Sequence, residues 1–135
     1  MEICMATDFN EWVETARQGV ALVTPRAAKA AIEADPETIV LDVRDACDLS
    51  ITGTIANTVH VSMGTLFFKA DHNLPEEHRA PELADKDRPI ITTCTLGMVA
   101  SIAAKTLLDY GYTNVRVLEG GNVAWREAGL PLEDA

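Results

Sequence analysis

The sequence has few cysteines, few aromatic residues and little positive charge. Its three cysteines, Cys4, Cys47 and Cys94, are an odd number without a Cys-x-x-Cys pair, which argues against a disulfide framework and favours a reducing compartment. The net charge is −10, so nucleic acid and anionic membranes are unfavourable partners. No run approaches the roughly 20 apolar residues of a membrane span, and the acidic start lacks the positive charge of a signal peptide. We therefore expect a cytoplasmic protein.

Strand-like and helix-like patterns alternate along the whole chain. Apolar, β-branched runs predict strands at 20–23, 39–44, 58–61, 90–93 and 114–118. Helical periodicity and caps predict helices at 9–18, 26–34 and 98–110, a last helix capped by Asn122, and an ambiguous one at 62–69. Trp12 and Trp125 are expected to anchor helices in the core. This alternation over 135 residues predicts one α/β domain with a mostly parallel sheet.

Cys94 stands between the predicted strand 90–93 and the predicted helix 98–110. A strand ending in cysteine, a short loop and a helix N-terminus place the sulfur where free backbone N–H groups converge. Such a site stabilises a thiolate, which is a competent nucleophile for sulfane sulfur or for a phosphate ester. Phosphate transfer needs positive charge on the transferred group, and the loop residues carry none. Sulfur transfer is therefore favoured.

Asp42 and Arg44 end the strand predicted at 39–44, at the carboxyl edge where α/β sheets bind ligands. Two interpretations are open for them: a ligand site, or an ion pair that anchors a loop. Cys47 follows closely and could either resolve an oxidised Cys94 as a disulfide or simply pack. An apolar group could form a pocket rim or belong to the core: Met63, Leu66, Phe67 and Phe68.

Four segments of the chain resemble the rhodanese (sulfurtransferase) family between about Thr24 and Glu133. They are the strand end Leu41-Asp42-Val43-Arg44, a degraded Gly53-Thr54-Ile55-Ala56-Asn57-Thr58, the loop Cys94-Thr95-Leu96-Gly97-Met98-Val99, and the closing segment Leu118-Glu119-Gly120-Gly121-Asn122-Val123-Ala124-Trp125-Arg126-Glu127-Ala128-Gly129-Leu130-Pro131. The last is the most specific. Val99 stands where small rhodaneses carry arginine, and the uncharged loop is similar to that of mercaptopyruvate-type sulfurtransferases.

The resemblance implies a single-domain rhodanese-like fold over residues 20–135, with a central parallel sheet flanked by helices, preceded by an extension over 1–19 with a short helix. It implies a persulfide on Cys94, support from Asp42, and substrate binding by a further set: Thr95, Leu96, Gly97, Met98, Val99 and Arg44. No cofactor is expected, and the spacing of the histidines and cysteines predicts no metal site. The donor would be thiosulfate-like, mercaptopyruvate-like or a persulfide. The acceptor would be cyanide or a thiol, on a small molecule or a protein. The uncharged loop weakens the case for thiosulfate. The alternative is a non-catalytic or redox-sensing rhodanese-like binding module.

Overall fold

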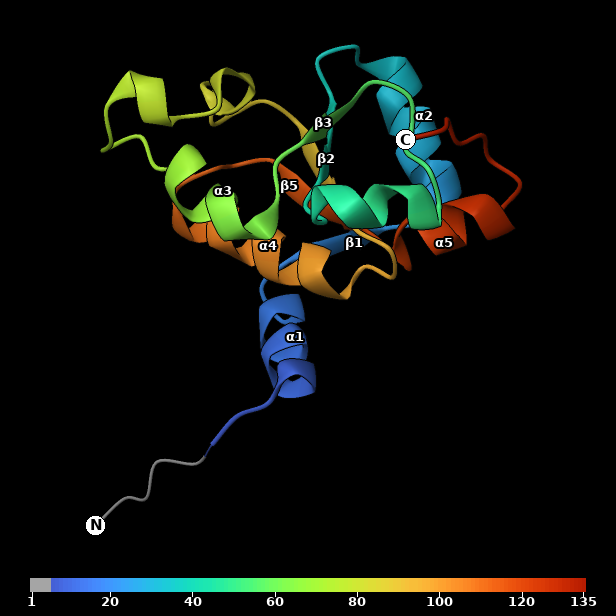
Figure 1. The fold of residues 1–135 in the computed structure, drawn as a ribbon, viewed down its shortest axis with the longest axis horizontal. Coiled ribbons are helices and arrows are strands. Elements are labelled where there is room, and N and C mark those ends of the chain that lie inside the picture. The colour runs from blue at the N-terminus through green and yellow to red at the C-terminus, as the bar shows by residue number, and fades with distance from the viewer. Residues whose placement is uncertain (1–5) are drawn as a thin grey trace.

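The computed structural model describes residues 6–135, so Cys4 lies outside the described part. Its centre is a five-stranded sheet in the order β1-β5-β4-β2-β3, with every neighbouring pair parallel (Figure 1). Each predicted strand is present, with ends that differ by at most two residues: β1 (Ala21–Val23), β2 (Ile39–Asp42), β3 (Thr58–His60), β4 (Ile90–Thr93) and β5 (Val115–Leu118). The prediction of an α/β domain with a parallel sheet is confirmed.

Five α-helices and three short 3₁₀ turns connect the strands over the described residues. The helices are α1 (Phe9–Arg17), α2 (Pro25–Ala34), α3 (Met63–Lys69), α4 (Met98–Asp109) and α5 (Gly121–Glu127), and the turns are η1 (Ala46–Ile51), η2 (Glu76–His78) and η3 (Pro81–Leu83). Thr24 caps α2 as predicted, because its hydroxyl accepts the Ala27 N–H at 3.3 Å and Pro25 occupies the first helical position. The domain boundary at residue 19/20 stays a prediction.

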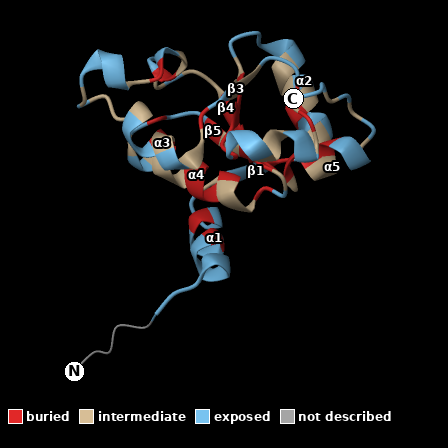
Figure 2. Ribbon diagram, viewed as in Figure 1, coloured by how far each residue is buried: buried red, intermediate tan, exposed pale blue. Residues whose placement is uncertain are grey.

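The two faces of the sheet are covered by different helices. Ile39 and Leu41 belong to the cluster that includes buried residues of α3 and α4. Val40, between them, joins the cluster that holds Ala28 of α2 and Trp125 of α5. This alternation is the period of two that a strand buried on both faces requires. Burial is accordingly concentrated in the central strands and the helix faces turned to them (Figure 2).

Two expectations about single side chains are wrong. Asn122 does not cap the last helix: Gly120, with φ +75°, occupies the cap position, and Asn122 is fully buried inside the first turn. Trp12 is 53% exposed, because the buried face of α1 consists of other residues. For the apolar group at 63–68, where pocket rim and core were both open, the structure places Leu66 in the core and leaves Phe67 and Phe68 exposed.

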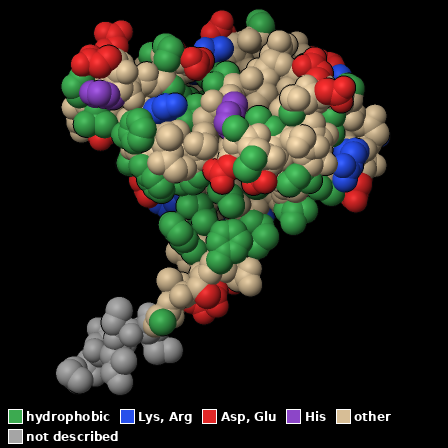
Figure 3. Space-filling model, in the orientation of Figure 1, with side chains coloured by type: hydrophobic (Ala, Val, Ile, Leu, Met, Phe, Trp, Pro, Cys, Tyr) green, Lys and Arg blue, Asp and Glu red, His purple; other side chains and the backbone are tan. Residues whose placement is uncertain are grey.

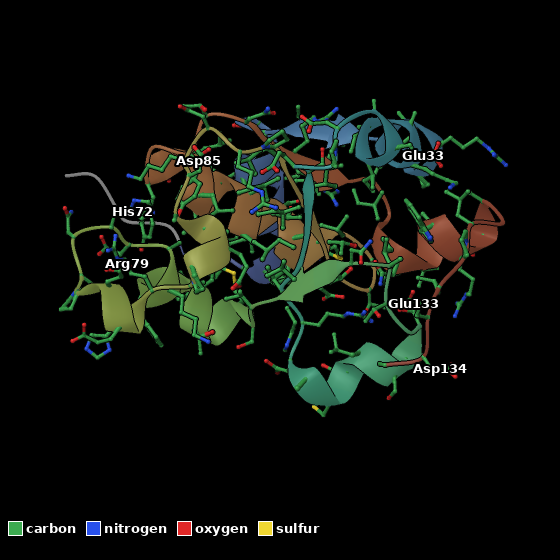
Figure 4. All side chains as sticks on the ribbon, turned by 90° about the horizontal axis from the view of Figure 1, so that it is seen from above. Glu33, His72, Arg79, Asp85, Glu133 and Asp134 are labelled. Atoms are coloured by element: carbon green, nitrogen blue, oxygen red, sulfur yellow. The ribbon has the colours of Figure 1, made fainter. Side chains whose placement is uncertain are left out.

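The chain ends beside the segment that follows η1. Thr54 forms an isolated antiparallel bridge with Glu133. Figure 4 shows Glu133 and Asp134 at this end of the molecule, far from His72 and Arg79 in the connection between α3 and β4. No helix within residues 6–135 combines the length and apolar character needed to cross a membrane.

Candidate active site

Cys94 follows the last residue of β4, the central strand of the sheet. It is 5% exposed and lines a cavity of about 390 Å³. The cavity lies between four parts of the chain: the start of α1, residues 43–48 after β2, the start of α3, and the loop 94–99. A single thiol therefore lies at the carboxyl edge of a parallel sheet, where such folds place their ligands.

Backbone N–H groups of the loop converge on the cysteine sulfur. Cys94 Sγ accepts the N–H of Gly97 at 3.1 Å and that of Ala100 at 3.5 Å. Gly97 has φ +86° and forms the N-cap of the 12-residue helix α4, a backbone conformation that glycine adopts without strain. The positive end of the helix dipole and the two donors together stabilise negative charge on the sulfur.

The first turn of α5 holds the carbonyl groups of the same loop. Asn122 N–H donates to Cys94 O at 2.9 Å, and Val123 N–H donates to Thr95 O at 3.1 Å. The Asn122 side chain also accepts the Thr93 hydroxyl at 2.7 Å, which ties α5 to the end of β4. Because N–H and C=O point in opposite directions across a trans peptide plane, these two bonds fix the orientation of the first two peptide planes of the loop, those that carry the Thr95 and Leu96 N–H groups.

Asp42 and Arg44 form a buried ion pair, 0% and 6% exposed, with Arg44 Nη2 2.7 Å from Asp42 Oδ2. Arg44 also donates to Asp48 O at 3.2 Å, to Thr52 Oγ1 at 3.0 Å and to Gly53 O at 3.0 Å. With Nε donating to Asp42 Oδ1 at 3.0 Å, its five N–H groups all have acceptors within the chain. The pair anchors the segment 48–53, and substrate contact by Arg44 stays a prediction.

The side chains that line the cavity carry a net negative charge. Among the described residues that line the cavity, Arg44 is the only cation, and Asp45 and Asp48 are the two carboxylates. Since Asp42 neutralises Arg44, the lining has no free positive charge to attract an anion. Within residues 6–135, no group of three or more His, Cys, Asp or Glu side chains is placed to hold a metal ion.

The structure brings most of the predicted loop residues to the cavity. Its lining includes Thr95, Leu96, Met98 and Val99, whereas Gly97 supplies an amide and no surface. Cys47 is exposed on η1 and does not line the cavity; its resolving role stays a prediction.

Sequence reasoning missed Phe9, which lines the cavity from α1. Apolar residues at positions 9, 13 and 16 of the chain have the spacing of one helix face. This spacing signals that α1 has a buried side, although not which surface it packs on.

Comparison with known proteins identifies the family. The rhodanese-like domain family matches residues 24–128. A candidate sulfurtransferase of Bacillus subtilis, YtwF, is 34% identical over 109 residues, 81% of this chain and 93% of that protein.

Among solved structures, a protein of unknown function from Rhodopseudomonas palustris, described as a possible tyrosine phosphatase, superposes with a TM-score of 0.86 at 27% identity. The superposition covers 98% of this chain and 99% of the other. The polysulfide-sulfur transferase homodimer of Wolinella succinogenes superposes with a TM-score of 0.71 at 29% identity, covering 94% and 88%. The chain belongs to the rhodanese-like domain family, whose relatives found here include proteins named as sulfurtransferases.

Proposed function

We propose that this protein is a sulfurtransferase that carries sulfane sulfur as a persulfide on Cys94. The observation that carries the proposal is the pair of amide donors on Cys94 Sγ, at 3.1 and 3.5 Å from Gly97 and Ala100. Each charge-assisted hydrogen bond contributes roughly 1.5–3 kcal/mol. The thiolate is thereby stabilised beside an open cavity without help from a basic side chain.

The reaction takes two steps. In the first, the Cys94 thiolate attacks the outer sulfur of a donor R–S–SH; the new S–S bond forms, the donor S–S bond breaks, and R–S⁻ leaves with the electron pair. The enzyme then holds Cys94–S–SH. In the second, an acceptor thiolate R′–S⁻ attacks the outer sulfur, giving R′–S–SH and returning the Cys94 thiolate. The amide donors stabilise the inner sulfur each time it becomes the leaving anion.

Two further donor classes give the same Cys94–S–SH with a different leaving group. A thiosulfate-like donor breaks its S–S bond and releases sulfite, and a mercaptopyruvate-like donor breaks its C–S bond and releases the enolate of pyruvate, which takes up a proton. Thiosulfate is the least favoured, because the loop residues 95–99 are uncharged and Arg44 is already paired with Asp42. Removing one cationic hydrogen bond from an anion site costs about 2.7 kcal/mol, or about two decades of rate. Cyanide or a thiol would be the acceptor. A cytoplasmic location, predicted from the sequence, would supply reduced thiols.

Cyanolysis and mass spectrometry test the proposal. We expect the protein, after incubation with a persulfide donor and desalting, to gain about 32 Da on the peptide that holds Cys94, and to release this sulfur as thiocyanate. Cys94→Ser should abolish the gain. Cys47→Ser is the matched control, because it removes an exposed thiol that does not line the cavity, and it should retain the gain.

The competing functions give different results. A binding or redox-sensing module would show no Cys94-dependent sulfur with any of the three donor classes, and that result would refute the enzyme proposal. A thiol phosphatase would hydrolyse a generic phosphate ester in a Cys94-dependent way. The geometry disfavours this, because the cation of the cavity lining is committed to Asp42.

A further inference from the structure

The wall of the cavity includes a residue from α1, a helix that precedes the family match at 24–128. Phe9, the first residue of α1, is 46% exposed and lines the same cavity as Cys94. Figure 1 shows α1 projecting from the body below α4, and hydrophobic side chains gather where it meets the body (Figure 3). The family domain alone therefore does not complete this cavity.

Two kinds of contact hold α1 in place. Val13 and Ala16, 2% and 3% exposed, pack against Ile102 of α4. Arg17 Nε donates to Ser101 Oγ at 3.0 Å, and its Nη2 donates at 3.4 Å to the carbonyl of Gly97, in the cysteine loop itself. The helix is thus bonded to the loop that carries the sulfur, and the position of Phe9 relative to Cys94 is set by these contacts.

The side chains that line the cavity are mostly apolar, and their net charge is negative. Six of its lining residues are apolar: Phe9, Val43, Met63, Leu96, Met98 and Val99. Arg44 is neutralised by Asp42, and Asp45 and Asp48 add negative charge. The two carboxylates repel a dianionic donor. An uncharged apolar group, in contrast, is stabilised when it leaves water and contacts these side chains.

From this geometry we infer that Phe9 is a specificity-determining residue and that the substrate is an organic persulfide or thiol with an uncharged, apolar substituent. The inference rests on the proposed function, and it names the substrate class of that site. The balanced steps given above apply with R and R′ apolar. Phe9 contacts the substituent and takes no part in bond making or breaking.

Acceptor selectivity tests the inference. The Cys94 persulfide is loaded, and sulfur transfer is measured to benzyl mercaptan, 2-mercaptoethanol and 3-mercaptopropionate, with rates expressed per thiolate. We expect kcat/KM to be highest for benzyl mercaptan and lowest for the carboxylate. In Phe9→Ala the ratio of benzyl mercaptan to 2-mercaptoethanol should fall roughly tenfold, mainly through KM, which is typical discrimination for one apolar wall.

Trp12→Ala is the matched control, because Trp12 is also an exposed aromatic residue of α1 but does not line the cavity. It should keep the wild-type ratio. Equal losses in the two variants, or a preference for 3-mercaptopropionate, would overturn the inference while leaving persulfide formation intact.

A second measurement needs no sulfur transfer. Benzyl alcohol should slow the alkylation of Cys94 by iodoacetamide in the wild type, and Phe9→Ala should weaken this protection, whereas propionate should protect neither protein. Absence of protection by benzyl alcohol in the wild type would also refute the inference. Failure of the persulfide to form, with protection retained, would instead count against the proposed function alone.

Discussion

Gly121 lies directly against the backbone of the cysteine loop 94–99. Its φ is +63°, and a Cβ at this position would lie 2.5 Å from Cys94 O and 2.7 Å from both Gly97 N and Thr95 O. All three atoms belong to the backbone of the loop. A side chain here must displace these groups, among them the Gly97 N–H that donates to Cys94 Sγ, so a backbone position on α5 controls the geometry of the loop after β4.

Replacement of this glycine should therefore impair sulfur loading as well as folding. Gly129→Ala provides the comparison, because Gly129 also has positive φ, +79°, but has nothing within 4 Å of an added Cβ. We expect Gly129→Ala to lower the free energy of unfolding by about 1–2 kcal/mol, the cost of holding an alanine in the left-handed backbone conformation. Gly121→Ala should cost more and should slow persulfide formation per mole of folded protein, measured by urea unfolding and by mass. Equal costs in the two variants would show that the loop does not depend on this contact.

The position of α1 depends on its cap as well as on its packing. Asp8 Oδ1 accepts the Glu11 N–H at 2.9 Å, which satisfies one of the free donors of the first turn. Phe9 lies in that turn. Loss of the cap would let the start of α1 fray while Val13 and Ala16, further along the helix, stay packed.

Asp8→Ala should accordingly destabilise the folded first turn of α1 by about 1 kcal/mol. Amide hydrogen exchange in the first turns of α1 should become faster, and the preference for benzyl mercaptan should fall in the direction expected for Phe9→Ala. Thr24→Ala removes the same kind of cap from α2, which does not line the cavity, and should speed exchange only there. If exchange in α1 stays unchanged in Asp8→Ala, the cap does not hold this wall of the cavity.

Tyr112 joins the long connection between α3 and β4 to the body of the protein. It is 2% exposed, and its hydroxyl lies 3.1 Å from Ala70 O, 2.9 Å from Leu83 O and 3.2 Å from His72 Nε2. Burial raises the pKa of Tyr112 to about 12; the charge of Arg79 lowers it, and that of Asp71 raises it. The folded state therefore favours the neutral phenol.

This shift predicts how stability depends on alkaline pH. The folded pKa, about 12, lies above the usual value of 10.0, so the unfolded chain loses its proton first. Keeping the phenol protonated contributes on the order of 2 kcal/mol to the free energy of unfolding. This contribution is complete below pH 10 and is lost as the pH rises toward 12. Urea unfolding across this range should show the decline. Tyr112→Phe should be less stable than the wild type at neutral pH but should lack this decline, so the two curves should converge. Parallel curves would contradict the assignment to Tyr112.

Local pattern in the sequence was sufficient for the five strands and for the position of Cys94 in the fold. The β-branched run at 90–93, the helical pattern from Met98 and the glycine between them placed Cys94 at a strand-to-helix junction, and the structure has it there. Asp42 and Arg44 were correctly placed at the same edge, because parallel strands end together. These features depend on neighbours along the chain and on one rule of sheet geometry, which a sequence displays directly.

Features that depend on contacts between distant segments were not predictable in this way. The apolar spacing in α1 showed that it has a buried face, but not that this face packs on α4, that Trp12 points to solvent, or that Phe9 reaches the cavity. Asn122 is of a residue type that often caps helices, yet it is buried and its side chain accepts the Thr93 hydroxyl. The local sequence shows which apolar faces and polar side chains must be buried or hydrogen-bonded. Which residues they contact depends on the packing of the helices, which brings together residues 29 and 84 positions apart in the two bonds Thr93–Asn122 and Arg17–Ser101.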